Sequence, residues 1–69
     1  MTVEKTIDLT ATGSSVEEAV AEAVQRASLM LRGVSRFEVE RIEGAVVDGD
    51  IVFRVDVKVS FVVKEHVHE

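Results

Sequence analysis

The last third of the chain alternates strictly between apolar residues and mostly polar ones. Every odd-numbered position from 51 to 63 is apolar, namely Ile51, Phe53, Val55, Val57, Val59, Phe61 and Val63. Because successive side chains of a strand point to opposite faces, this period of two predicts a long β-strand with one face in a core. We expect the strand to span residues 51–64.

A turn signal stands directly before this strand. Asp48-Gly49 favours the left-handed backbone of a two-residue hairpin turn, and residues 36–47 before it are predicted to form the partner strand. Such a turn pairs Val47 with Asp50. Even-numbered residues of one strand then lie opposite odd-numbered residues of the other.

The apolar pattern of residues 36–47 changes phase part of the way along. Phe37 and Val39 stay on the same face as the odd-numbered residues of the last strand only if one extra residue is inserted. We therefore predict a β-bulge near Glu40–Arg41, with Asp56 opposite both residues.

Residues 2–11 also alternate and predict another strand with one buried face. Its apolar side chains are Val3, Ile7, Leu9 and Ala11. Lys5 falls on this face, where its long stem covers apolar surface while its ammonium group reaches water.

Residues 15–32 have the period of an α-helix. Apolar residues at steps of four and three form one stripe, which consists of Val16, Val20, Val24, Ala27 and Leu31. Ser15 followed by Glu18 is typical of a helix start, and Gly33 is expected directly after the helix end. Other apolar residues predict a second covered side, and these are Ala19, Ala21, Ala23, Leu29 and Met30.

The order of the segments predicts an α+β fold of the type β-α-β-β, with a three-stranded antiparallel sheet wrapped on one helix. Residues 1–69 then form a single domain. A domain of this length buries only about 60% of the surface that its unfolded chain exposes, so it is marginal alone. Since the chain has neither cysteine nor proline, we expect a homo-oligomer to supply the missing stability.

Composition disfavours several kinds of partner. Eight Lys and Arg against 13 Asp and Glu give a net charge of −5, which argues against nucleic-acid phosphates. The absence of cysteine excludes disulfides and thiolate metal sites. The sequence shows no long apolar run and no signal-peptide pattern, so we expect no membrane partner and a cytoplasmic location.

The sequence does not support an enzyme. The two histidines, His66 and His68, lie in the C-terminal tail, which cannot hold a base within about 3 Å of a serine. With Glu65 and Glu69 beside them they have the spacing of a transition-metal chelate, but a polar terminal tail is the simpler explanation, since terminal residues are usually mobile. We predict no catalytic residues and assign no metal site.

The even-numbered face of the predicted hairpin is the candidate binding surface. It carries Arg36, Glu38, Arg54, Asp56 and Lys58. One interpretation is a solvated face with alternating salt bridges. The other is a wall at a subunit contact, where the guanidinium planes of Arg36 and Arg54 stack on a flat ring or clamp an anionic group.

The chain resembles the dodecin family over nearly its whole length. The matching stretches are Lys5-Thr6-Ile7-Asp8-Leu9, Gly13-Ser14-Ser15, Val16-Glu17-Glu18-Ala19, Ala23-Val24-Gln25-Arg26-Ala27, Leu31-Arg32, Phe37-Glu38-Val39, Ile42-Glu43-Gly44 and Phe53-Arg54-Val55-Asp56-Val57-Lys58-Val59-Ser60-Phe61. The resemblance implies a hollow homododecamer of tetrahedral symmetry. It also implies storage or sequestration of a flavin, FMN or riboflavin, as stacked pairs between subunits on two-fold axes.

The sequence departs from the family pattern at two positions of the implied flavin site. Arg36 stands where the family has a tryptophan that stacks on the isoalloxazine, and Arg54 stands where a glutamine binds its pyrimidine edge. A guanidinium lacks the stacking area of an indole and has no hydrogen-bond acceptor, so we expect flavin binding to be weak or lost.

Three hypotheses follow from this departure. The chain forms a dodecin-like storage shell that still takes FMN or riboflavin through Arg36 and Arg54. Alternatively, the same shell binds a different small anion or calcium. In the third hypothesis the chain is a ligand-free structural module, in which the two arginines pair with carboxylates across the subunit contact.

Overall fold

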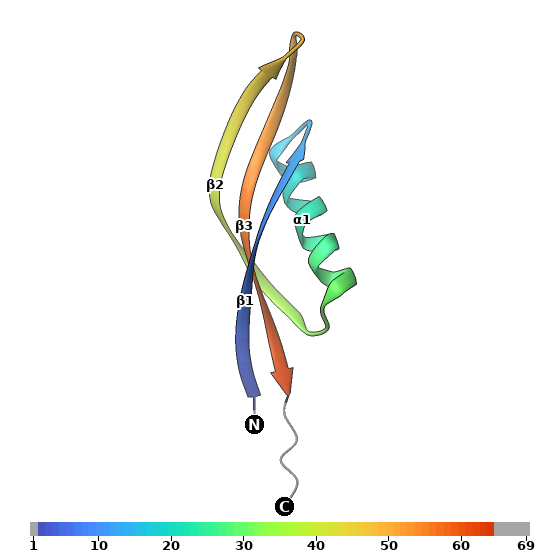
Figure 1. The fold of residues 1–69 in the computed structure, drawn as a ribbon, viewed down its shortest axis with the longest axis vertical. Helices are drawn as coiled ribbons and strands as arrows, with labels where there is room; N and C mark the ends of the chain where they lie inside the picture. Colours follow the sequence, from blue (N-terminus) through green and yellow to red (C-terminus); the bar gives the residue numbers. More distant parts are fainter. Residues whose placement is uncertain (1, 65–69) are drawn as a thin grey trace, which may run out of the picture.

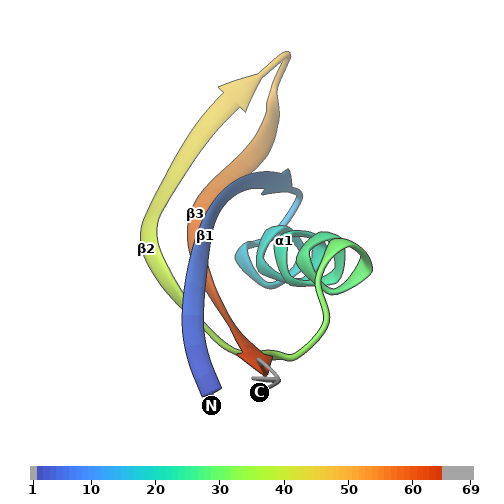
Figure 2. The same cartoon turned by 60° about the horizontal axis from the view of Figure 1, so that its bottom comes forward.

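A computed structural model describes residues 2–64. It consists of β1 (Thr2–Gly13), α1 (Val16–Met30), β2 (Val34–Val47) and β3 (Asp50–Lys64). The strands form one antiparallel sheet in the order β1-β3-β2. The sheet is curved and α1 lies against its concave face (Figures 1 and 2). The predicted β-α-β-β fold is confirmed.

The hairpin turn lies where the sequence predicts it. Asp48 and Gly49 have φ angles of 51° and 84°, the two positive values that a type I′ turn requires. Val47 pairs with Asp50 directly beyond the turn. The twist of this turn matches that of the flanking strands and so sets the register of the whole hairpin.

The predicted β-bulge is also present. Val39 pairs with Val57, but the next paired residue of β2 is Arg41, which lies opposite Asp56. Glu40 is therefore the inserted residue. The insertion keeps the apolar side chains of β2 on the concave face on both sides of the bulge.

The start of α1 is capped as expected. The Ser15 side chain accepts a hydrogen bond from the backbone N–H of Glu18 at 3.1 Å. The Glu18 carboxylate in turn accepts one from the Ser14 hydroxyl. These contacts satisfy a free amide of the first turn and place negative charge at the positive end of the helix dipole.

The end of α1 differs from the prediction. The helix ends at Met30 rather than at Arg32, because the backbone of Leu31 is already extended, with φ −126° and ψ 145°. The N–H of Leu31 donates to the carbonyl oxygen of Ala27 at 2.8 Å and closes the last turn. Gly33 is thus not the first residue beyond the helix. It lies in the connection to β2 with φ +76°.

The core lies between α1 and the concave face of the sheet. Its fully buried residues are Ala19, Ala23, Ala27, Val55, Val57 and Val59. Ala27 of the predicted stripe belongs to this core, but Val16, Val20 and Val24 are only half-buried at its edge, so the buried row is displaced from the predicted one. Alanine side chains are short enough to let the helix backbone approach β3 closely. Close packing therefore favours the alanine row, rather than the valine row, on the side of the helix that faces the sheet.

The half of the β2–β3 hairpin that contains the turn extends beyond α1 (Figure 1). Four large apolar side chains in this part are exposed, namely Ile42, Val46, Val47 and Ile51. Within residues 2–64 no helix has the length and apolar character needed to cross a bilayer.

Candidate functional site

The face of the sheet away from α1, called the outer face below, carries both predicted site residues. The strand register sets its side chains in rows across β1, β3 and β2. The rows are Thr6-Ser60-Arg36, Asp8-Lys58-Glu38, Thr10-Asp56-Arg41 and Thr12-Arg54-Glu43. Charges of opposite sign alternate within and between these rows, so the outer face is polar without being strongly basic.

Arg36 bridges the full width of the sheet. Its Nη2 donates to Oε1 of Glu4 at 2.8 Å, although Glu4 is on β1 and Arg36 on β2. The pair therefore passes over the central strand near Ser60, which pairs directly with Arg36 and is only 6% exposed. The hydroxyl of Ser35, which is on the same strand as Arg36, donates to the carbonyl oxygen of Ser60 at 3.4 Å.

The charge of Arg36 is stabilised by its surroundings. The hydrogen bond that Arg36 donates to Glu4 raises the pKa of Arg36 above its usual value, the negative charge of Glu4 adds to this, and Glu38 contributes less. Burial opposes the shift only weakly, because the guanidinium side chain is 72% exposed. Arg36 is therefore a permanent cation at this surface.

The neighbouring charges are paired as well. Lys58 Nζ lies 3.4 Å from Oε2 of Glu40, although Glu38 is the register partner of Lys58. The inserted Glu40 of the bulge thus supplies the carboxylate that holds this lysine. Further along, Arg41 Nε lies 3.2 Å from Oε1 of Glu43.

Arg54 has no such partner within residues 2–64. None of the ion pairs among the described residues includes it, and its row neighbour Glu43 is already bound to Arg41. Arg54 lies six residues along β3 from Ser60, the residue opposite Arg36, which corresponds to about 20 Å at 3.3 Å per residue. One chain therefore does not bring Arg36 and Arg54 together.

A shallow hollow opens beside Arg36. Its volume is about 360 Å³, and its lining residues are Glu4, Thr6, Arg36, Phe37, Glu38, Lys58 and Ser60. This volume falls in the range of small-molecule sites, about 300–1,000 Å³. The lining contains two cations and two carboxylates, so this part of the outer face suits a polar ligand.

These residues do not fit a flavin sandwiched between aromatic rings. The sequence contains neither tryptophan nor tyrosine. The aromatic residue that lines the hollow, Phe37, pairs with the core residue Val59 and so belongs to the concave side. The donors present are guanidinium and ammonium groups, which suit phosphate or carboxylate oxygens.

The flank of α1 forms a second, apolar hollow on the concave side. It has a volume of about 450 Å³ and is lined by Val16, Glu17, Val20, Ala21, Val24, Gln25 and Phe37. Phe37 is 50% exposed there. A half-exposed phenylalanine beside a row of valines is typical of a surface that another protein chain covers.

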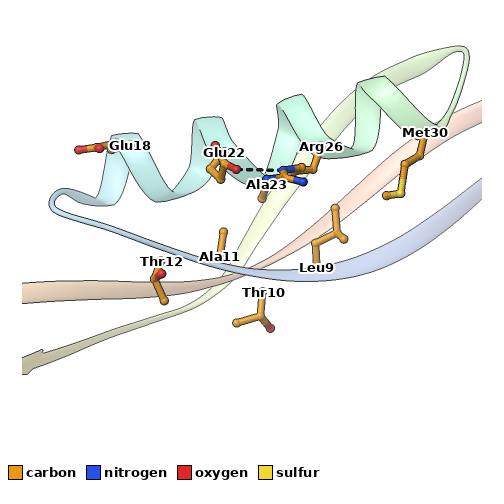
Figure 3. Close-up of a pocket in the computed structure, with 9 residues that line it drawn as sticks. All are labelled: Leu9, Thr10, Ala11, Thr12, Glu18, Glu22, Ala23, Arg26 and Met30. Carbon is orange, nitrogen blue, oxygen red and sulfur yellow. Dashed lines mark hydrogen bonds and ion pairs between the residues drawn. The ribbon is translucent and has the colours of Figure 1, made fainter.

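A third hollow, of about 560 Å³, lies between β1 and α1 (Figure 3). Leu9 and Ala11 point into it, whereas Thr10 points away from the helix (Figure 3). The charged groups at its rim are already satisfied: Arg26 Nε binds Oε1 of Glu22 at 3.0 Å. We assign no ligand site to this hollow.

No group of three or more acidic or histidine side chains suited to a metal ion occurs within residues 2–64. The histidines considered from the sequence, His66 and His68, lie outside the described residues together with Glu65 and Glu69.

Sequence reasoning predicted Arg36 as a site residue but did not predict its ion-pair partner, Glu4. Glu4 is recognisable as polar from the alternation of residues 2–11. Its distance from Arg36 depends on β1 and β2 flanking the same central strand, and no local pattern gives that order.

Comparisons with known proteins bear on the fold and the site together. The family model described as Dodecin matches residues 3–64. The chain is similar to dodecin from Streptomyces coelicolor, with 31% identity, a TM-score of 0.84, and coverage of 94% of this chain and 96% of that chain. A mutant of Thermus thermophilus dodecin matches with 30% identity, a TM-score of 0.86, and coverage of 94% and 100%.

A third similar structure is the calcium dodecin of Mycobacterium tuberculosis. It has 39% identity and a TM-score of 0.77, over 86% of this chain and 87% of that chain. That protein is described as a calcium-chelating antigen with a calcium-binding site. No curated protein sequence matches the chain.

Proposed function

Because the chain belongs to the dodecin family, we propose that it is a non-enzymatic storage protein that assembles into a homododecameric shell and binds a small anionic ligand. The ligand site is the outer face around Arg36 and Arg54, completed by a second subunit. Of FMN and riboflavin, this favours FMN, because FMN carries a phosphate and riboflavin does not.

Assembly is supported by apolar surface that one chain leaves uncovered. Phe37 and the valine row of α1 form one such patch. The part of the hairpin that extends beyond α1 forms another. Burying these surfaces in subunit contacts would supply the stability that so short a domain lacks.

The single observation that supports an anionic ligand is the pair of exposed arginines, Arg36 and Arg54, on one polar face. A guanidinium presents a planar fork of N–H donors that matches two oxygens of a phosphate or carboxylate. Arg54 has no ion-pair partner among the described residues. Since the two arginines lie about 20 Å apart along the sheet, a shared site requires Arg36 of one subunit and Arg54 of another.

Thermal melting of the assembled protein tests this proposal. Phosphate-bearing ligands such as FMN should raise the melting temperature, and Arg36→Ala or Arg54→Ala should reduce that rise. Arg26→Ala is the matched control, because Arg26 is bound to Glu22 on the helix, away from the outer face. An FMN-induced rise that is unchanged in both outer-face variants would contradict the proposal.

A second candidate function is a ligand-free assembly module, and Arg54 favours it, because its guanidinium has no ion-pair partner among the described residues and a carboxylate of a neighbouring subunit would supply one. In that case the arginines hold carboxylates rather than ligands. The same variants would then disrupt the oligomer in buffer alone, as seen by light scattering.

Calcium is a further ligand candidate, favoured by the likeness to the calcium dodecin. Its site would combine carboxylates of more than one chain. A calcium titration of the assembled protein by calorimetry, with magnesium as the control cation, separates this candidate from anion binding.

A further inference from the structure

We propose that Glu4 determines the ligand preference of the outer face, because its carboxylate is an internal competitor that an anionic ligand must displace from Arg36. This inference rests on the proposed anion-binding function. It goes further by naming a residue that limits affinity rather than one that supplies it.

The geometry places Glu4 where an incoming anion would bind. Its Oε1 lies 2.8 Å from Arg36 Nη2, the distance of a charge-assisted hydrogen bond. Both side chains line the hollow on the outer face and reach each other across the central strand. A phosphate oxygen directed at this nitrogen would occupy the same place as the Glu4 oxygen.

The pair is exposed enough to open. The Arg36 side chain is 72% exposed and that of Glu4 is 45% exposed. Exposed ion pairs contribute little to stability, so displacing Glu4 disturbs the fold little. The freed guanidinium then offers its planar fork to a second anion.

The charges around the hollow strengthen the effect of Glu4 on the binding of an anionic ligand. Arg36 and Lys58 supply two positive charges, and Glu4 and Glu38 supply two negative ones. Lys58 is also bound to Glu40. An anion therefore meets a surface with no net positive charge and has to displace Glu4 to reach Arg36, whereas an uncharged ligand does not compete with Glu4 for the guanidinium.

Replacing Glu4 by glutamine tests the inference. Glu4→Gln should tighten FMN binding by about fivefold in fluorescence anisotropy, since an exposed ion pair of this kind is weak. Glu38→Gln is the matched control, because it removes the same charge from the same hollow without a hydrogen bond to Arg36. We expect less than about a twofold change for this control and an unchanged riboflavin affinity for both variants.

The outcomes separate this inference from the proposed function. If FMN binds and Arg36→Gln weakens it, but Glu4→Gln behaves like Glu38→Gln, Glu4 is not the competitor and only the inference fails. If neither the native protein nor Glu4→Gln binds FMN or inorganic phosphate, both claims fail. Tightening confined to Glu4→Gln, and lost again in the double variant with Arg36→Gln, supports the inference.

Discussion

The backbones of Gly33 and Val62 lie in direct contact where the chain passes from α1 into β2. The N–H of Val62 donates to the carbonyl oxygen of Gly33 at 3.0 Å. A Cβ atom at position 33 would lie 2.6 Å from the carbonyl oxygen of Val62. With φ at +76°, position 33 therefore requires glycine for both conformation and space.

This contact predicts that Gly33→Ala destabilises the fold. The left-handed backbone alone costs a non-glycine residue about 1–3 kcal/mol, and the contact with Val62 adds to it. Urea unfolding at a fixed protein concentration measures the loss. Gly44→Ala is the control, because a Cβ there meets nothing within 4 Å. Equal losses in the two variants would contradict the role given to Gly33.

The close approach of α1 to β3 predicts that Ala27→Leu is unfavourable. Ala27 is fully buried in the core between the helix and the sheet, so a larger side chain there has to push the helix away. We expect a loss of about 1–3 kcal/mol in the free energy of unfolding. Ser28→Leu, at an exposed position of the same helix, should cost much less. A stabilising effect of Ala27→Leu would show that the alanine row does not set the helix–sheet distance.

The apolar hollow beside Phe37 predicts that Val20→Asp prevents assembly. A carboxylate there would be buried against apolar groups in any contact that covers the patch, which is costly. Size-exclusion chromatography with light scattering should show a smaller species than the native protein. Gln25→Asp adds the same charge at the rim of the same hollow and should leave the assembly intact. A full-size assembly of Val20→Asp would remove this patch from the subunit contact.

Much of the fold follows from local patterns. The alternation from Ile51 to Val63 predicts β3 because burial on one face has the period of the strand itself. The bulge at Glu40 follows from two local facts, the two-residue turn at Asp48-Gly49 and the phase of Phe37 and Val39. The turn and the apolar phase each involve residues close together in the sequence. They can therefore be recognised without knowing the tertiary packing.

Other features depend on contacts that no local pattern contains. Hydrophobicity favours Val20 and Val24 as the buried stripe, but the distance between helix and sheet favours Ala19 and Ala23. The helix end at Met30 is likewise set by the extended path that the chain takes into β2.

The candidate site also combines features that local patterns predict with features that depend on tertiary contacts. The positions of Arg36 and Arg54 on one face follow from strand alternation. The bond from Arg36 to Glu4 follows from the order β1-β3-β2, which is tertiary information.

The most direct test of the account is the difference in affinity between FMN and riboflavin for the assembled protein, measured by fluorescence anisotropy. The two ligands share the same ring system and differ in one phosphate. If the outer face recognises anions, FMN binds more tightly than riboflavin, and Arg36→Gln removes most of that difference. Equal affinities for the two flavins, or a difference that survives in Arg36→Gln and Arg54→Gln alike, would contradict anion recognition by these arginines.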